Sequence, residues 1–178
     1  MIVNIQSRSV ILTPSKCGST SILYSIKRPW LPCLGPSSWD LENVSPHQDL
    51  HFSKIEYKDI HLVGIVVRNP YDRALSLYHQ RCRDEDFEGC TFTEWIETYP
   101  YEFPFFYPYS RLLNNKTPDF VIHLENIDEE FYKYTNCKIT FSKIHEGGYS
   151  YKLTHSEKRK IRKVYEDDFT LGRYDKDI

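Results

Sequence analysis

The sequence predicts an α/β protein built around a small parallel sheet. Three apolar segments of strand length, residues 9–13, 61–67 and 119–125, are each followed by a segment with helical features. The middle one, HLVGIVV, is a nearly continuous apolar run, the pattern of a strand covered on both faces in a parallel sheet. Strands that alternate with helices along one chain favour right-handed crossovers between parallel neighbours.

The first unit runs from a buried strand at 9–13 through a turn at 14–19 into a helix at 20–27, which the next proline ends. Residues 29–50 hold four prolines and two tryptophans, so we expect a long irregular stretch there. Stretches of that length within compact domains often form binding loops.

Helix-start signals mark the later units. Asn69 as N-cap and Pro70 in the first helical position predict a helix directly after the central strand. Thr154 followed three residues later by Glu157 predicts a capping box, and its helix is expected to run to about residue 168. Further expectations are a short helix from Thr91, an aromatic loop at 101–110 and a helix at 126–135.

Length, charge and cysteines limit the possible classes of protein. The 178 residues predict a single domain, 1–178, and the formal net charge of −2 gives no global reason to expect nucleic acid or an anionic membrane as a partner. The five cysteines are odd in number and form no CxxC pair, which favours a reducing compartment without a zinc site. The oligomeric state is left open.

Apolar runs are short throughout the chain. The N-terminal segment is broken by polar residues, and no later segment approaches the 18 apolar residues of a membrane span. We therefore expect a cytoplasmic protein without signal peptide or membrane anchor, from a bacterial or viral source, or else an excised catalytic domain.

The turn after the first strand has the composition of an anion site. It offers backbone N–H groups at a helix start, one lysine and several hydroxyls, all suited to a phosphate. The nucleoside-triphosphatase loop GxxxxGK(S/T) is not matched, because Lys16 precedes Gly18 instead of following the second glycine. The alternative is a turn that only caps a helix. The residues concerned are Ser15, Lys16, Gly18, Ser19, Thr20 and Ser21.

A second anion site is predicted at the end of the central strand. Arg68 comes at the carboxyl end of that strand, the edge at which ligands of open α/β sheets bind. Ser76 follows about two turns into the next helix, where its hydroxyl can face back toward Arg68. Alternatively, Arg68 pairs with Asp72 or Asp84 and Ser76 is only a small helix residue. Two such sites on adjacent strands would suit a nucleotide with two separate phosphates.

The two segments together resemble a known family. SKCGSTS and, some fifty residues later, VVRNPYDRALSLY are similar to the two signatures of sulfotransferases that use 3′-phosphoadenosine 5′-phosphosulfate (PAPS), especially the carbohydrate sulfotransferases. Weaker similarity continues through TFTEWI, FFYPYSRLL, FVIHLENIDEEF and YEDDFTLGRYD, so the resemblance covers nearly the whole chain from Val10. One departure is Ser15, where the family usually has proline directly before the lysine.

The resemblance implies a P-loop-like three-layer fold, with a small central parallel sheet flanked by helices. It also implies PAPS as sulfate donor, with Arg68 and Ser76 at the 3′-phosphate. No metal is expected, and the sequence contains no convincing cluster of metal ligands. The residues implied at the 5′-phosphosulfate are Ser15, Lys16, Cys17, Gly18, Ser19, Thr20 and Ser21.

Sulfuryl transfer by in-line attack needs a cation at the leaving oxygen and a base for the acceptor hydroxyl. Lys16 is the expected catalytic cation. His47 is the expected base because neutral imidazole accepts protons near pH 7, and His51 is the second choice. Some relatives use glutamate, which keeps Glu42 and Glu56 open.

The acceptor is expected to be a hydroxyl-bearing glycan or glycoconjugate. Aromatic segments such as YPYEFPFFYPYSRLL could stack on sugar rings, and the basic run EKRKIRK could attract an anionic glycan. Aromatics that close a small core and a solvated helix face are the alternatives, and small alcohols, phenols or lipids stay open as acceptors. Two other functions remain: a kinase-like P-loop phosphotransferase, and a non-catalytic nucleotide-binding or glycan-binding module.

Overall fold

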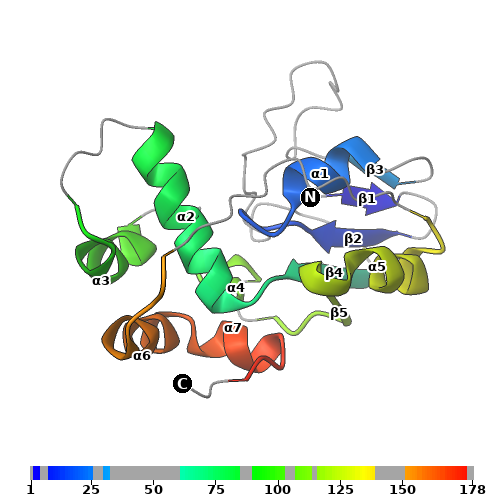
Figure 1. The fold of residues 1–178 in the computed structure, drawn as a ribbon. Helices are drawn as coiled ribbons and strands as arrows, with labels where there is room; N and C mark the ends of the chain where they lie inside the picture. The colour runs from blue at the N-terminus through cyan, green and yellow to red at the C-terminus, as the bar shows by residue number, and fades with distance from the viewer. Residues whose placement is uncertain are drawn as a thin grey trace.

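The protein is a mixed α/β molecule in which a sheet lies beside a group of helices (Figure 1). The computed structural model describes residues 2–4, 8–25, 30–32, 61–84, 90–102, 107–113, 116–138 and 151–175. Within these ranges, no helix is long and apolar enough to cross a membrane.

A five-stranded sheet has the order β3-β1-β2-β4-β5. The three strands expected from the sequence, β2 (Ser9–Leu12), β4 (Leu62–Val67) and β5 (Phe120–His123), are parallel neighbours, which confirms the small parallel sheet. β1 (Ile2–Asn4) pairs antiparallel with β2, and β3 (Trp30–Pro32) pairs antiparallel with β1. The sequence did not predict these two strands, because three residues are too few for a periodic pattern.

The central strand β4 is buried where it lies between its two neighbours. Its last four residues are buried, as its apolar run predicts. Gly64 pairs with Phe120 of β5, and a Cβ atom at Gly64 would lie 2.2 Å from the Phe120 ring. The ring therefore occupies the space above the glycine, and it also stacks on Tyr134 at a centroid distance of 4.6 Å. This close approach explains a glycine within the central strand.

Two predicted helix starts are confirmed by their hydrogen bonds. The Asn69 side chain accepts from the Tyr71 N–H at 3.0 Å, and Thr154 and Glu157 form a complete capping box. The helices are α1 (Ser19–Ser25), α2 (Pro70–Asp84), α3 (Phe92–Glu102), α4 (Tyr109–Leu112), α5 (Ile127–Thr135), α6 (His155–Val164) and α7 (Glu166–Leu171), with a 3-10 turn at Leu124–Asn126.

Two expectations about helices were wrong. The helix expected to run from 154 to about 168 is interrupted at Tyr165, whose φ of −114° separates α6 from α7. The break lets α7 turn so that Asp168 and Phe169 are both buried. The aromatic stretch at 101–110, expected to be a loop, contains the end of α3 and the start of α4.

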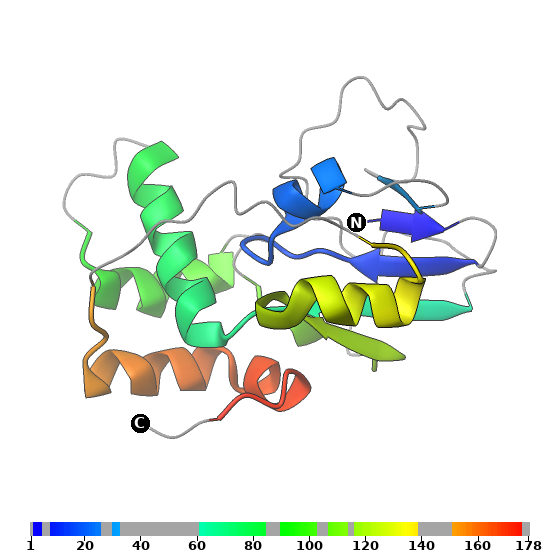
Figure 2. The same cartoon turned by 45° about the vertical axis from the view of Figure 1, so that its right-hand side comes forward.

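The described residues form two apolar clusters. One surrounds the sheet and includes residues of α4 and α5, and the other joins α2, α3, α6 and α7. Figures 1 and 2 show this second group beyond the carboxyl ends of β2 and β4, while α5 lies along β4 and β5. The carboxyl edge of the parallel strands is therefore the place where the two halves meet.

Candidate functional site

The turn between β2 and α1 has an unusual backbone. Lys16 has a φ of 64° and Gly18 a φ of 73°, both in the left-handed region, and the Cys17 N–H donates to Pro14 O at 3.1 Å. Only glycine adopts this region at no steric cost, so the conformation of Lys16 is strained. Turns that combine right- and left-handed residues direct backbone N–H groups into anion-binding concavities.

The residues after the turn open α1. Ile22 N–H donates to Gly18 O at 2.9 Å, which is the first bond of the helical ladder, so the N–H groups of residues 18–21 precede that ladder. Ser19 is half-buried and Ser21 is buried, and both lie with Thr20 in the first turn of α1. The predicted residues therefore form one continuous segment that runs from the turn into the start of α1.

Arg68 lies against this turn. Its Nη1 donates to the carbonyl oxygen of Lys16 at 3.3 Å, across 52 residues of sequence. The alternative of an ion pair with Asp72 is not seen among the described residues, and the side chain of Asp84 lies outside them. The two segments that the sequence marked separately as anion sites are thus in direct contact at the ends of β2 and β4.

Ser76 and Cys17 have buried side chains. Ser76 lies on α2 with 5% of its surface exposed, and in the described part of the chain no hydrogen bond joins it to Arg68. The Cys17 thiol lies in the core, 3.0 Å from the Tyr109 hydroxyl, and burial raises its pKa to about 11. Only the backbone of Cys17 therefore remains available to an anion in the turn.

A buried ion pair contacts the turn between β2 and α1. Arg73 of α2 pairs with Asp168 of α7 at 3.1 Å, and both side chains are almost fully buried. Arg73 Nε donates to Ser15 O at 3.3 Å and its Nη2 to Tyr107 O at 3.0 Å. Asp168 accepts the Tyr109 N–H at 2.6 Å. Sequence reasoning gave Arg73 and Asp168 no role, although Arg73 belongs to the Asp-Arg pair of the second motif.

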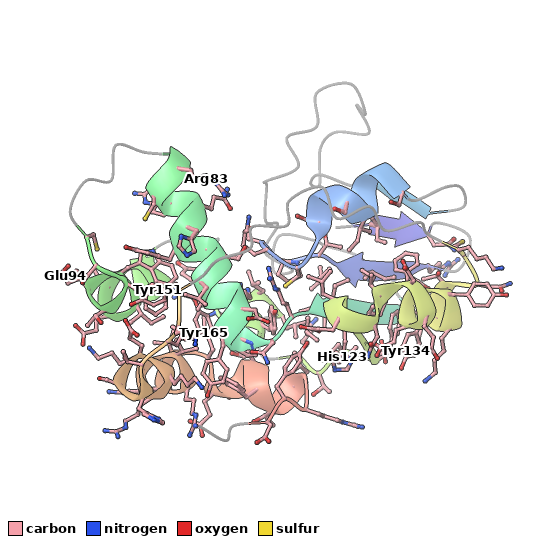
Figure 3. All side chains as sticks on the ribbon, in the orientation of Figure 1. Arg83, Glu94, His123, Tyr134, Tyr151 and Tyr165 are labelled. Atoms are coloured by element: carbon pink, nitrogen blue, oxygen red, sulfur yellow. The ribbon has the colours of Figure 1, made fainter. Side chains whose placement is uncertain are left out.

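A second polar group closes the edge of β5. Glu125 accepts the Asn69 N–H at 2.8 Å and the Tyr174 hydroxyl at 2.8 Å, which ties the start of α2 to the C-terminal segment. His123, labelled in Figure 3, contacts Glu130 through Nδ1 and Gly172 O through Nε2, each at 2.9 Å. These contacts hold the residues flanking the site, and the sequence gave no signal for them.

Several predicted residues lie outside the described ranges. His47, His51, Glu42 and Glu56 all fall between residues 33 and 60, so the identity of the base stays a prediction. Among the described residues, no group of three or more His, Cys, Asp and Glu side chains is arranged to hold a metal ion.

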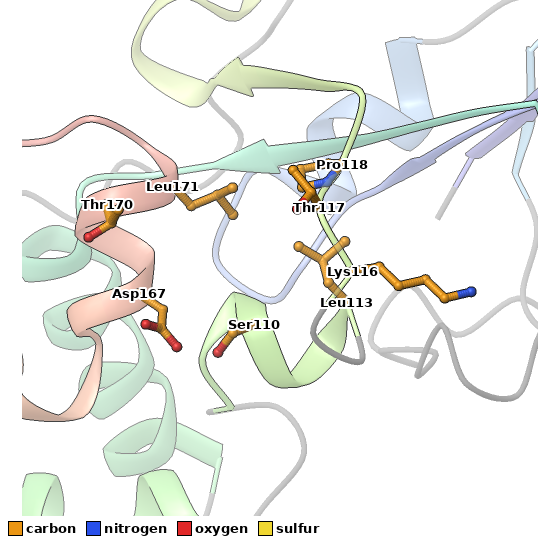
Figure 4. Close-up of a pocket in the computed structure, with 8 residues that line it drawn as sticks. All are labelled: Ser110, Leu113, Lys116, Thr117, Pro118, Asp167, Thr170 and Leu171. Atoms are coloured by element: carbon orange, nitrogen blue, oxygen red, sulfur yellow. The ribbon is translucent and has the colours of Figure 1, made fainter.

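A cavity of about 260 Å³ lies between α4, α7 and residues 116–118 (Figure 4). Figure 4 shows the carboxylate of Asp167 and the hydroxyl of Ser110 turned toward each other at this cavity. None of the predicted site residues lines it. The lining residues are Ser110, Leu113, Lys116, Thr117, Pro118, Asp167, Thr170 and Leu171.

Comparisons with protein-family models, with curated proteins and with solved structures found no significant match for the chain.

Proposed function

We propose that the protein is a PAPS-dependent sulfotransferase. The observation that supports this most directly is the hydrogen bond from Arg68 to the Lys16 carbonyl, at 3.3 Å. It joins two motifs that the sequence marks independently as phosphate sites, at the carboxyl ends of the adjacent parallel strands β2 and β4. Nucleotides of open α/β sheets bind at that edge. A ligand with two separated phosphates suits two cationic segments side by side.

The proposed reaction transfers a sulfuryl group to a hydroxyl. The acceptor oxygen attacks sulfur in line, the bond between sulfur and the 5′-phosphate oxygen breaks, and adenosine 3′,5′-bisphosphate (PAP) leaves. Lys16 stabilises the negative charge that grows on the leaving phosphate, and Arg68 with Ser76 holds the 3′-phosphate. The strained φ of Lys16 supports a functional role for this residue, because such strain concentrates at ligand sites.

The proposal also includes a more specific fold, the P-loop-like three-layer fold. A strand, a turn suited to an anion and a helix, next to a second parallel strand, are features of P-loop-like folds, and the order of β2, α1 and β4 supports this part of the proposal. We assign the chain to a compact version of that fold.

His47 is proposed as the base that removes the acceptor proton, and His51 is the second choice. Transfer by His47→Ala should fall about 100-fold or more, with PAP affinity unchanged. Unchanged transfer would move the assignment to His51, Glu42 or Glu56.

A glycan is proposed as the acceptor, but the basic helix α6 supports this only in part. Lys160 is paired with a glutamate of α3, and Arg162 donates to the Tyr71 hydroxyl at 2.7 Å. Arg159 and Lys163 are the exposed cations of this run. A transfer screen over an acceptor library, read by mass spectrometry, identifies the acceptor class.

Thermal stability with different nucleotides tests the proposed function. A ligand that binds only the folded state raises the melting temperature, and it does so more the tighter it binds. PAP should therefore raise the melting temperature more than ATP with magnesium does. Arg68→Ala should weaken PAP binding by about tenfold or more, because the variant loses a charge-assisted contact with a phosphate. Arg159→Ala, which removes an exposed cation of α6, is the matched control and should bind PAP as the wild type does.

Two results would favour the other functions. Stronger stabilisation by ATP with magnesium would support a phosphotransferase. Absence of stabilisation by either nucleotide would leave a binding module of the same fold.

A further inference from the structure

The hydroxyl of Tyr109 lies between the two anion segments. Tyr109 is the first residue of α4 and is fully buried. Its hydroxyl accepts the Arg68 N–H at 3.0 Å and lies 3.0 Å from the Cys17 Sγ. Cys17 follows Lys16 in the turn after β2, and Arg68 directly follows β4. One hydroxyl therefore touches the backbone of one segment and a side chain of the other.

The ring of Tyr109 is held in place by the same buried group that supports the turn. Its own N–H donates to Asp168 at 2.6 Å, and Asp168 pairs with Arg73 at 3.1 Å. The Arg73 guanidinium lies 4.6 Å from the centre of the Tyr109 ring and donates to Ser15 O. The contacts thus form one continuous network that joins Tyr109 to the turn both directly and through Asp168 and Arg73. Buried networks that are fully bonded are rigid, because any displacement leaves polar groups unpaired.

The two groups in contact at the hydroxyl are both neutral. Burial raises the pKa of Tyr109 well above its ordinary value and raises that of Cys17 to about 11. The phenol keeps its proton and accepts from Arg68 N–H. Its own O–H faces the Arg68 carbonyl oxygen at 3.5 Å and the Cys17 sulfur at 3.0 Å, and the Cys17 thiol can donate to the phenol oxygen. The contact is therefore a fixed structural link and not a proton-transfer pair.

We propose that Tyr109 is a positioning residue that fixes the spacing between the two phosphate-binding segments, so that a nucleotide with both a 3′- and a 5′-phosphate meets two preformed subsites. The proposal rests on the sulfotransferase function, and it adds a specificity role for a residue outside both motifs. Subsites held at the correct spacing make the second phosphate contact intramolecular, so they favour the doubly phosphorylated ligand over either monophosphate.

Calorimetry with three ligands tests the role of Tyr109. Wild type and Tyr109→Phe are titrated with PAP, adenosine 5′-phosphate and adenosine 3′-phosphate. Tyr109→Phe keeps the ring and removes only the hydroxyl, so each monophosphate should bind within about threefold of wild type. PAP should bind about tenfold more weakly, because the spacing between subsites is no longer fixed.

Tyr78→Phe is the matched control. The Tyr78 hydroxyl donates to Cys90 O at 2.9 Å, farther along α2, so this variant also loses one hydrogen bond of a tyrosine. It should keep the wild-type preference for PAP. If Tyr109→Phe does not fold, Cys17→Ala removes the contact on the turn side alone and should also reduce the preference.

The outcomes separate the two proposals. A Tyr109→Phe variant that keeps the wild-type ratio of affinities for PAP and the monophosphates overturns the role of Tyr109 and leaves the function intact. Equal weakening of all three ligands shows a general structural role and overturns it as well. A wild type without preference for PAP overturns the proposed function, and the role of Tyr109 with it.

Discussion

Lys16 combines a strained backbone with the side chain expected to do the chemistry. Its φ of 64° costs a residue with a Cβ atom about 1–2 kcal/mol relative to the right-handed region. The surrounding contacts hold it there, because Cys17 N–H closes the turn on Pro14 and Arg68 donates to the Lys16 carbonyl. A glycine would fit this position better, but it would lack the ammonium on which the proposed reaction depends.

Substitution at Lys16 should separate stability from activity. Lys16→Gly should be more stable than Lys16→Ala by about 1 kcal/mol in urea unfolding, because glycine accepts the positive φ. Both variants should lose most sulfuryl transfer. Arg173, exposed with a φ of 51°, is the matched control: Arg173→Gly should exceed Arg173→Ala in stability to a similar extent and keep activity. Wild-type transfer by Lys16→Gly would contradict the role of the ammonium.

At the scale of elements, His123 connects the end of β5 to the end of α7. Its ring nitrogens face two acceptors, Gly172 O and the Glu130 carboxylate, so only the doubly protonated ring donates to both. The ring also packs edge-on against Tyr174, 5.5 Å away. Burial opposes the charge, but the bonds to Gly172 and Glu130, with Glu125 nearby, outweigh it and raise the His123 pKa above 6.5.

This contact should make stability depend on pH. The stabilisation is fully present below pH 6.5 and should be lost as the pH rises through the raised pKa of the folded state. His123→Gln should lower the free energy of unfolding by about 1 kcal/mol at the acid end, where charged hydrogen bonds are lost, and flatten the pH profile. His155→Gln, at an exposed position of α6, is the control. Urea unfolding at a series of pH values measures how the free energy of unfolding depends on pH. If His123→Gln shows the same dependence as the wild type, His123 is not its source.

At the scale of the whole molecule, the Arg73–Asp168 pair lies where the two apolar clusters meet. Asp168 holds the backbone of Tyr109 in the sheet cluster, and the ring of Tyr165 in the helical cluster lies 5.4 Å from the Arg73 guanidinium (Figure 3). A buried ion pair adds little net stability over a well-packed apolar pair. Removing one partner is different, since it leaves an uncompensated buried charge.

A double-mutant cycle tests this view of the junction. Arg73→Met or Asp168→Leu alone should each cost about 3–5 kcal/mol of unfolding free energy, whereas the double variant should cost less than the sum of the two. The ion pair between Lys160 and Glu97, which is partly exposed, is the control, and its loss should cost less than about 1 kcal/mol. Strictly additive costs at Arg73 and Asp168 would show that the two residues act independently.

Local patterns predicted most of the regular structure. The three parallel strands, the N-cap at Asn69 and the capping box at Thr154 were all found where apolar runs and cap residues marked them. The break at Tyr165 was missed because the helix signal continues across it, and it accompanies the burial of Asp168. β1 and β3 depend on pairing with distant strands.

The sequence by itself determined the order of the three parallel strands and of the helices that follow them, and it marked Lys16 and Arg68 as residues that follow parallel strands, because apolar periodicity and cap residues are local signals. Only the tertiary structure decided that Arg68 touches the Lys16 carbonyl and that Tyr109 lies between their segments. Those contacts join residues that are 41 to 92 positions apart. Contacts between such distant residues leave no periodic trace in the sequence and depend on the packing of α4 and α7 against the sheet.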